Sequence, residues 1–317
     1  MSFKIIGTGS YLPPLTVTND DLAKTIDTSD EWITQRIGIK SRRISEDEST
    51  AEMGYKAAKE ALTESGTAPE ELDLIIAASI TGDTICPTTA GGIQKLLGAT
   101  CPAFDINSAC SGFVFALDTA AGFFARGTVK KVLVVGSERI SKIVDWKDRN
   151  TCVIFGDGAG AAVLTEGDGY LDSKISTFGG DDVIKIPSGL NLSPYYKKET
   201  ELGKIHMAGQ ETFKFAVSRI SEDIKYLCDS AGIPPEDIDR IVPHQANERI
   251  IDYAAKRLHL PKEKFFVNIE SYGNTSAASI AIALAELDHK GGLKKGDKII
   301  LTAFGGGLSS ASCLIEW

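Results

Sequence analysis

Short apolar runs alternate along the chain with segments whose apolar residues recur at helical spacing. The runs rich in β-branched and small apolar residues predict strands at Val132–Val135, Ala161–Leu164, Asp239–Val242 and Lys298–Leu301. The longer apolar run Phe113–Leu117 predicts a buried helix. This alternation is typical of βαβ units around a buried, mostly parallel sheet. The pattern therefore predicts an α/β fold.

Two halves of the chain repeat the same order of features. A helical stretch ending at Ser65–Gly66 leads to Pro69 and an apolar run, and a second one ending at Ala231–Gly232 leads in the same way to Pro235. The offset is 235 − 69 = 166 residues. A period this long indicates duplication of a whole domain rather than a solenoid.

Two further landmarks follow the same offset. It moves the predicted strand Val132–Val135 onto 298–301, which also has the pattern of a strand. It moves Cys110 onto Ser276, which again precedes an alanine-rich helical stretch. The glycine-rich segment Gly156–Gly160 precedes a predicted strand, whereas a phosphate-binding loop follows a strand and opens a helix. We therefore interpret it as a structural turn.

Composition and charge narrow the class of protein. The chain has 317 residues, of which 43% are hydrophobic and 24% charged, as in ordinary globular proteins. A net charge of −9 argues against general nucleic-acid binding but allows a local basic patch for an acidic partner. The six cysteines are scattered, without metal-ligand spacing, which favours reduced thiols and no metal site. No apolar run reaches membrane-spanning length, and we expect a cytoplasmic enzyme.

Three residues lie in local contexts suited to chemistry. Cys110 directly precedes the predicted helix at 113–117, where the helix dipole and free N–H groups favour a thiolate. His244 follows a predicted strand, and Asn274 precedes another helix. Such a set can build nucleophilic acyl transfer. The alternative is a core cysteine, a surface histidine and a turn asparagine.

The local sequence around these residues resembles that of the β-ketoacyl-acyl-carrier-protein synthase III family of the thiolase superfamily. Members of this family are the initiating condensing enzymes of bacterial fatty-acid synthesis. Six segments match that family in order: Asp27–Ile33, Ala109–Phe113, Phe155–Ala161, Pro243–Asn247, Tyr272–Ser279 and Phe304–Gly307. The resemblance implies a duplicated thiolase-like fold, layered α-β-α-β-α. One half at 1–170 would carry the cysteine, and the other at 171–317 would carry the histidine and asparagine.

The resemblance also implies a two-step reaction without a cofactor, in which CoA thioesters are substrates. Cys110 attacks acetyl-CoA or a similar primer, and the backbone N–H groups of Cys110 and Gly306 form the oxyanion hole. Malonyl-acyl-carrier protein then loses CO2 and attacks the acyl-enzyme, while His244 and Asn274 donate hydrogen bonds to the enolate oxygen. Removing one such donor typically costs a factor of about 10²–10³ in rate. Asparagine at the third position favours decarboxylative condensation, since related branches often have His or Glu there.

Further residues match the family's substrate contacts. The implied CoA-binding residues are Trp32, Arg36, Arg149, Gly209 and Asn247, and the implied acyl-pocket or tunnel residues are Cys86, Met207, Phe213 and Phe304. For Trp32 the alternative is a half-buried helix aromatic, and for the apolar residues it is a plain core role.

The implied partners are the acidic acyl-carrier protein and a second copy of the chain. The docking residues for the carrier would be Lys214, Arg249, Lys256 and Arg257, although each could simply be a solvated surface charge. Within the segment Arg249–Arg257, the residues Arg249, Tyr253 and Lys256 share a helical face.

Two departures from the family pattern bear on function. Leu308–Ala311 follows the glycines, where the family usually has Leu or Phe and then Thr-Trp-Gly, and the missing tryptophan leaves the packing behind the oxyanion loop open. Cys86 stands where a bulkier residue often precedes the proline of a loop that caps the partner's acyl pocket. A smaller side chain there could admit longer or branched primers. The irregular segment Phe178–Gly203 could form a lid over the entrance.

Three alternatives stay open at this point. A specialised relative could prime a polyketide or signalling molecule with the same three residues. A Cys-His-Asn hydrolase of the papain type places its cysteine in a different motif and has no internal duplication. A non-catalytic carrier-binding or scaffold protein would be favoured by a missing nucleophile, but Cys110 is present.

Overall fold

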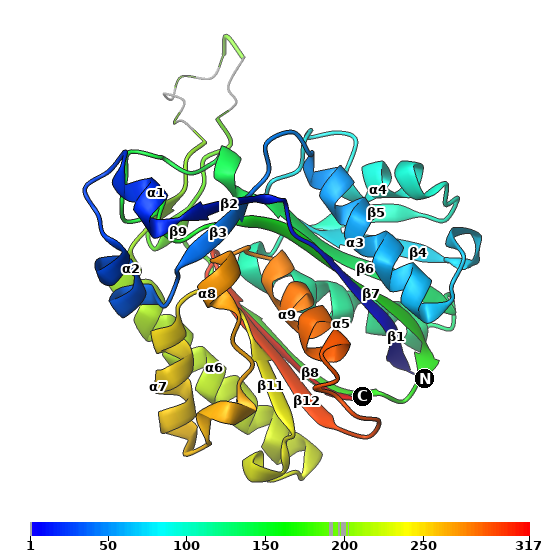
Figure 1. Ribbon diagram of the computed structural model, residues 1–317. Helices are drawn as coiled ribbons and strands as arrows, with labels where there is room; N and C mark the ends of the chain where they lie inside the picture. The colour runs from blue at the N-terminus through cyan, green and yellow to red at the C-terminus, as the bar shows by residue number, and fades with distance from the viewer. Residues whose placement is uncertain (1, 190–192, 196, 198–200, 202) are drawn as a thin grey trace.

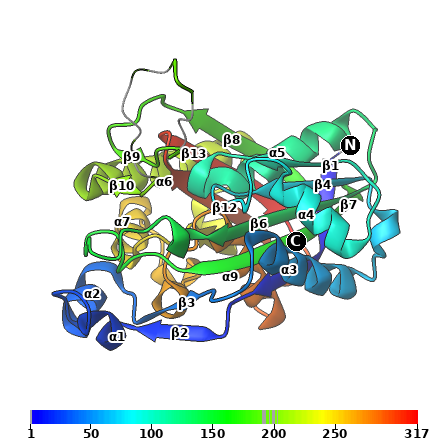
Figure 2. The same cartoon turned by 90° about the horizontal axis from the view of Figure 1, so that it is seen from above.

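The computed structural model describes residues 2–189, 193–195, 197, 201 and 203–317. Its two large sheets lie one behind the other, with helices on both outer faces and between them (Figures 1 and 2). The first sheet has the order β1-β7-β6-β4-β5, with bounds Ser2–Tyr11, Asp157–Gly167, Lys131–Arg139, Leu74–Ala78 and Ala103–Ile106. The second has the order β11-β12-β13-β8, with bounds Arg240–Pro243, Lys298–Gly305, Ser309–Glu316 and Tyr170–Thr177.

Both large sheets mix parallel and antiparallel strands. β4 pairs in parallel with β5 and β6, and β11 with β12, whereas the remaining neighbours are antiparallel. The α/β class is confirmed, but the sheets are mixed rather than mostly parallel. The apolar runs could not distinguish the two arrangements, because helices cover both faces and every central strand is buried either way. Two small ribbons complete the strands: β2 (Leu15–Thr18) with β3 (Ser41–Ile44), and β9 (Ile184–Lys185) with β10 (His206–Met207).

The predicted duplication is visible in the order of strands. Shifting β4 and β6 by 166 residues brings them onto β11 and β12, and β1-β7-β6-β4 corresponds to β8-β13-β12-β11. The helices follow: α3 (Thr50–Ser65) matches α6 (Gly209–Ala231), and α5 (Gly112–Ala125) matches α9 (Ala278–His289). Both α3 and α6 end where the sequence predicted, and in each the residue that follows, Gly66 or Gly232, is left-handed. The domain boundary at residue 170 stays a prediction.

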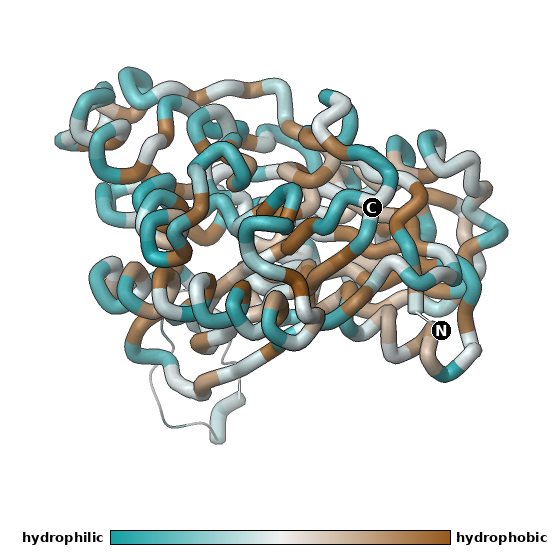
Figure 3. The backbone as a smooth tube through the Cα atoms, turned by 90° about the horizontal axis from the view of Figure 1, so that it is seen from below, coloured by the Kyte–Doolittle hydropathy of each residue, from teal (hydrophilic) through white to brown (hydrophobic). Residues whose placement is uncertain are grey.

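The layers follow from the apolar faces of the helices. α3 and α4 (Thr89–Leu97) cover the outer face of the first sheet, and α6 and α7 (Glu248–Leu258) cover that of the second. α5 and α9 lie between the two sheets in one core with both. This is the predicted α-β-α-β-α order. Hydrophobic residues concentrate along the inner strands and hydrophilic ones along the outer segments (Figure 3). The remaining helices, α1 (Asn19–Ala23), α2 (Asp30–Ile37) and α8 (Ile269–Tyr272), lie to one side.

Glycines in the first sheet let α9 approach its strands closely. A Cβ at Gly160 would lie 2.6 Å from Ala281, and one at Gly136 would lie 2.5 Å from the Ala277 carbonyl oxygen. The interpretation of Gly156–Gly160 as a turn was wrong, because β7 already begins at Asp157. Gly158 and Gly160 lie inside this strand and let α9 pack closely against it, which flanking sequence alone does not reveal.

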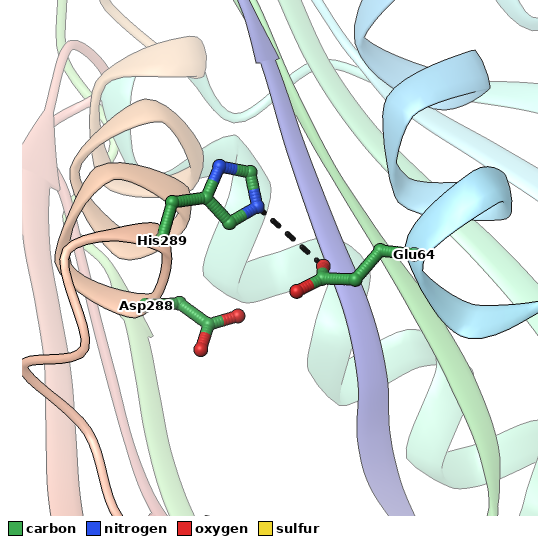
Figure 4. A group of neighbouring side chains, drawn as sticks. All are labelled: Glu64, Asp288 and His289. Atoms are coloured by element: carbon green, nitrogen blue, oxygen red, sulfur yellow. Dashed lines mark ion pairs between the residues drawn. The ribbon is translucent and has the colours of Figure 1, made fainter.

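A polar contact joins the two halves at the C-terminal end of α9. Asp288 and His289 face Glu64 of α3, with His289 Nε2 3.6 Å from the carboxylate (Figure 4). The buried Thr8 hydroxyl donates to Asp288 at 2.9 Å. Possible metal-ligand atoms of the three residues lie within 4.8 Å of one another. Thr8 already binds both carboxylates, and we assign the cluster to joining the halves.

Within the described residues, no helix is long and apolar enough to cross a membrane.

Candidate active site

A cavity of about 1100 Å³ opens between the two halves, and it contains all three reactive residues predicted from the sequence. Cys110 comes from the first half, and His244 and Asn274 come from the second. The surrounding wall is mostly apolar, with polar side chains such as His244, Asn247 and Asn274 among its lining residues. Such a concave, apolar cavity with a few converging polar groups is typical of a substrate site.

Two equivalent turns of the duplicated fold meet at this cavity. Cys110 lies in a 3-10 turn, Ala109–Ser111, that leads into α5, and Ser276 lies in the matching turn before α9. Ala109 has φ +46° and Ser276 has φ +51°, a region that non-glycine residues rarely adopt. Strained backbone of this kind concentrates at functional sites. The duplication therefore brings two helix N-termini to one place.

The Cys110 thiol is protonated in the unliganded chain. Burial raises the pKa of Cys110 to about 12, and the nearby Glu138 carboxylate raises it further, whereas a hydrogen bond from Ser276 lowers it. The sequence context favours a thiolate, as predicted for a helix N-terminus, but burial outweighs these favourable contacts. The thiol proton must leave when a substrate reacts.

His244 is a buried residue directly after β11, not a surface histidine. Its side chain is 2% exposed, and its ring lies edge-on to Phe304 with centroids 5.3 Å apart. Nδ1 lies 2.7 Å from the Ser279 hydroxyl of α9. Burial lowers the pKa of His244 to about 3, so the imidazole is neutral throughout the physiological range.

Asn274 bridges the two halves through its backbone. Its N–H donates to the Ile154 carbonyl at 2.9 Å, and its own carbonyl accepts from Gly156 at 3.0 Å. The side-chain Oδ1 accepts the Ser276 N–H at 2.8 Å. Because the carbonyl end is occupied, the amide end of Asn274 is left to donate into the cavity.

The glycines at the end of β12 run directly beside the nucleophile. A Cβ at Gly305 would lie 2.7 Å from the Cys110 nitrogen, and one at Gly306 would lie 3.6 Å from the Ala109 Cβ. The unusual segment after these glycines is held by Ser309. Its hydroxyl contacts Ser111 Oγ at 2.7 Å and donates to the Gly306 carbonyl at 3.1 Å. Hydrogen bonds of Ser309 thus hold the segment that lacks the usual tryptophan.

Sequence reasoning missed Glu138 and Ser279. Glu138 is fully buried at the end of β6, where it accepts from the Ile80 N–H at 3.2 Å and from the Thr81 hydroxyl. Burial raises the pKa of Glu138 to about 7. Glu138 lies in none of the matched segments, and Ser279 ends the matched segment Tyr272–Ser279 without any sign of a role of its own. The roles of both depend on contacts between distant segments.

The predicted CoA residues gather at the cavity mouth. The guanidinium groups of Arg36 and Arg149 lie 4.8 and 5.1 Å from the Trp32 ring centre. A second aromatic ring stacked between Trp32 and Arg149 would need a gap of about 7 Å between the indole and the guanidinium, since each contact takes about 3.5 Å. Arg149 must therefore move away from Trp32 before such a ring can enter. Asn247 caps α7 and donates to the Arg36 carbonyl at 3.2 Å, while Gly209 opens α6. Arg149 lies beside the cavity wall, and the other four line it.

The predicted apolar and basic residues divide into two groups. Met207, Phe213 and Phe304 line the cavity, as do Lys214 and Arg249. Exposed Cys86, Lys256 and Arg257 lie outside the wall formed by the described residues. Arg257 is paired with Glu222 at 3.9 Å, and Arg249 lies over Phe213. The structure therefore brings two of the four basic residues to the cavity mouth, with the other two farther along α7.

The segment Phe178–Gly203 falls partly outside the described residues, and the prediction of a lid extends over those positions. Of the described part, Asp181–Ile186 and Glu201 line the cavity. Phe178 N–H donates to the Leu308 carbonyl at 2.7 Å, which ties the start of the segment to the glycine loop.

A duplicated α/β fold that brings a cysteine at a helix N-terminus, a histidine and an asparagine to one cavity has the arrangement of a thiolase-like condensing acyltransferase. Family models described as 3-Oxoacyl-[acyl-carrier-protein (ACP)] synthase III and its C-terminal part match residues 104–179 and 228–317. The chain belongs to this family. The predicted family, fold class and acyltransferase class are confirmed, and the hydrolase and scaffold alternatives are wrong.

Relatives match over the whole chain. The β-ketoacyl-[acyl-carrier-protein] synthase III of Clostridium acetobutylicum is 49% identical over 321 residues, covering 100% of this chain and 99% of that protein. The crystal structure of the Aquifex aeolicus synthase III has a TM-score of 0.94 at 48% identity, covering 99% and 100%. A priming β-ketosynthase from the R1128 polyketide pathway has a TM-score of 0.92 at 35% identity, covering 99% and 96%.

Proposed function

We propose that this chain condenses a short acyl-CoA primer, acetyl-CoA or a similar thioester, with malonyl-acyl-carrier protein. The products are a β-ketoacyl-acyl-carrier protein, CoA and CO2, and the reaction is the initiating step of fatty-acid synthesis. The observation that carries the proposal is the convergence of Cys110, His244 and Asn274 on one cavity. The matched relatives support it by their names.

In the first step, the Cys110 sulfur bonds to the acyl carbon of the primer. The bond from that carbon to the CoA sulfur breaks, and the thiol proton leaves with CoA. The backbone N–H groups of Cys110 and Gly306 stabilise the oxyanion, and the close approach of the β12 glycines to the Cys110 turn supports this role. The raised pKa of the thiol fits a proton transfer coupled to attack rather than a stored thiolate.

In the second step, malonyl-acyl-carrier protein loses CO2 and leaves an enolate on its thioester oxygen. His244 and Asn274 donate hydrogen bonds to that oxygen, and both donors are neutral, so neither depends on protonation near pH 7. The enolate carbon attacks the acyl carbon. The bond to Cys110 breaks, and the departing thiolate takes up a proton from solvent, since decarboxylation of the malonyl carboxylate releases none.

The cavity mouth suits the CoA moiety. Trp32 and Arg149 flank the adenine, Arg36 lies near the phosphates, and Gly209 and Asn247 line the pantetheine channel. The lining by Trp32, Arg36, Gly209 and Asn247, together with the contact of Arg149 with Trp32, supports this assignment. Met207, Phe213 and Phe304 supply apolar wall for the acyl chain. No cofactor enters the proposed chemistry.

The basic residues Lys214, Arg249, Lys256 and Arg257 dock the acidic carrier protein. All four are exposed on the neighbouring helices α6 and α7, and two of them reach the cavity mouth. On a chain of net charge −9, a local basic patch attracts an acidic partner that the rest of the surface repels.

The functional unit is a homodimer in the cytoplasm. Exposed Ile85, at 82%, and its neighbour Cys86 lie on a loop outside the cavity of their own chain, which fits a loop that caps the partner's acyl pocket. Priming of a polyketide on another carrier is the second candidate. The 35% identity to a priming β-ketosynthase of a polyketide pathway favours keeping it.

The test is incubation of the protein with labelled acetyl-CoA and malonyl-acyl-carrier protein, beside a Cys110→Ala control. We expect protein-bound label and acetoacetyl-acyl-carrier protein by mass spectrometry, both lost in the control. A Cys110 adduct without product would contradict the proposed extender or carrier. Absence of both would contradict the proposed primer.

A further inference from the structure

The hydrogen-bond partners of His244 determine which ring nitrogen carries its proton. The ring is neutral and buried, and a neutral imidazole has one nitrogen that donates and one that accepts. Nδ1 lies 2.7 Å from Ser279 Oγ, and Ser279 is the second residue of α9. This contact crosses from the end of β11 to a helix 35 residues further along the chain.

Counting hydrogens at Ser279 resolves the tautomer. The Gln245 N–H donates to Ser279 Oγ at 3.0 Å, so the oxygen already accepts one hydrogen bond. The hydroxyl has a single hydrogen of its own. Among the described residues, the hydrogen bonds of this hydroxyl go to Gln245 and His244. If Nδ1 carried a hydrogen, the hydroxyl hydrogen would be buried without an acceptor, because Ser279 is 2% exposed.

We propose that Ser279 is a positioning residue that donates to His244 Nδ1 and thereby holds the hydrogen on Nε2, the nitrogen left to donate to the substrate oxygen. The inference rests on the proposed role of His244 in the second step. Asn274 is arranged by the same principle, since the Ser276 N–H occupies its Oδ1 and leaves its amide hydrogens for the cavity. In both residues the protein occupies the acceptor and leaves the donor free.

The folding of α9 keeps this serine in place. Ser279 N–H donates to the Ser276 carbonyl at 3.2 Å, and the start of α9 lies directly against Gly136 of β6. The edge contact of Phe304 limits rotation of the imidazole. The hydroxyl therefore meets a ring that packing already holds, and its contribution is to select the tautomer.

The test compares Ser279→Ala with Ser279→Thr, which restores a hydroxyl. In Ser279→Ala we expect condensation with malonyl-acyl-carrier protein to fall about 10- to 100-fold, below the loss for complete removal of a donor. Transfer of acetyl from acetyl-CoA to Cys110 stays within about twofold of wild type, because that step uses the backbone oxyanion hole. Ser279→Thr recovers most of the condensation rate. Ser221→Ala is the matched control, because its buried hydroxyl bonds only the helix carbonyl of Val217 among the described residues.

Nitrogen NMR of histidine-labelled protein gives a second measurement. The chain has four histidines, and the His244→Ala variant identifies the signals of His244. We expect wild-type protein to carry hydrogen on Nε2, and Ser279→Ala to show a tautomer mixture.

Hydrogen on Nδ1 in wild type, or an undiminished condensation rate in Ser279→Ala, would overturn the positioning role. If His244→Ala itself condenses normally, the proposed function of His244 fails instead.

Discussion

Gly136 on β6 is the place where a single methyl group should displace the active site. A Cβ there would lie 2.5 Å from the Ala277 carbonyl oxygen and 3.0 Å from the Ala278 Cα, both backbone atoms at the start of α9. Ordinary contact begins at 3.4 Å, so in Gly136→Ala the helix start must move by about 0.9 Å. That backbone continues from Asn274 and carries Ser279.

The expected losses follow from that displacement. Overpacking of this kind costs about 1–3 kcal/mol, which corresponds to a fall in melting temperature of roughly 2–5 °C for a chain of this size. A shift near 1 Å in catalytic groups can cost about 10²-fold in rate. We therefore expect condensation in Gly136→Ala to fall about 10²-fold, by a larger factor than acetyl loading of Cys110.

The assays are calorimetric melting, condensation with malonyl-acyl-carrier protein, and acetyl loading measured by mass spectrometry. Gly122→Ala in α5 is the matched control, because a Cβ there meets nothing within 4 Å and alanine favours a helix by about 1 kcal/mol. It should melt at or above the wild-type temperature and keep its activity. A Gly136→Ala protein with wild-type melting and condensation would refute the argument that this contact positions α9.

The other predictions concern charge, docking, pocket size and CoA binding. The Glu138 carboxylate raises the pKa of Cys110, so Glu138→Gln should lower that pKa and move the pH profile of Cys110 alkylation to lower pH; an unchanged profile would contradict the coupling. Arg249→Glu should weaken use of the carrier protein far more than use of acetyl-CoA, whereas Arg126→Glu, which also removes a guanidinium from a phenylalanine ring, should change neither; equal losses on both substrates would refute docking. Cys86→Phe should raise the ratio of acetyl-CoA to isobutyryl-CoA turnover, and an unchanged ratio would show that this loop does not limit the primer. Trp32→Ala should raise KM for acetyl-CoA about tenfold or more with little change in kcat, since it removes a stacking surface remote from the reacting carbon; a loss confined to kcat would contradict that assignment.

Local patterns were enough to predict the α/β class and the duplication. They also singled out Cys110, His244 and Asn274, which line one cavity and whose catalytic roles stay predictions. Strand and helix periods depend on neighbouring residues, and the 166-residue offset is visible without a structure because both halves retain the same sequence landmarks. The contexts of Cys110, His244 and Asn274 are local too, and the motif resemblance identified the family from them. Local patterns could not predict whether neighbouring strands pair in parallel, or that most of the segment 156–160 belongs to a strand. Both properties depend on which distant strand or helix lies alongside.

Only the tertiary structure decided how these residues behave. The sequence context of Cys110 suggested a thiolate, but burial among groups from both halves raises its pKa to about 12. Glu138 and Ser279 gained their significance from contacts with residues more than 30 positions away. Desolvation and hydrogen-bond partners depend on everything packed around a group, and a linear pattern does not contain that information.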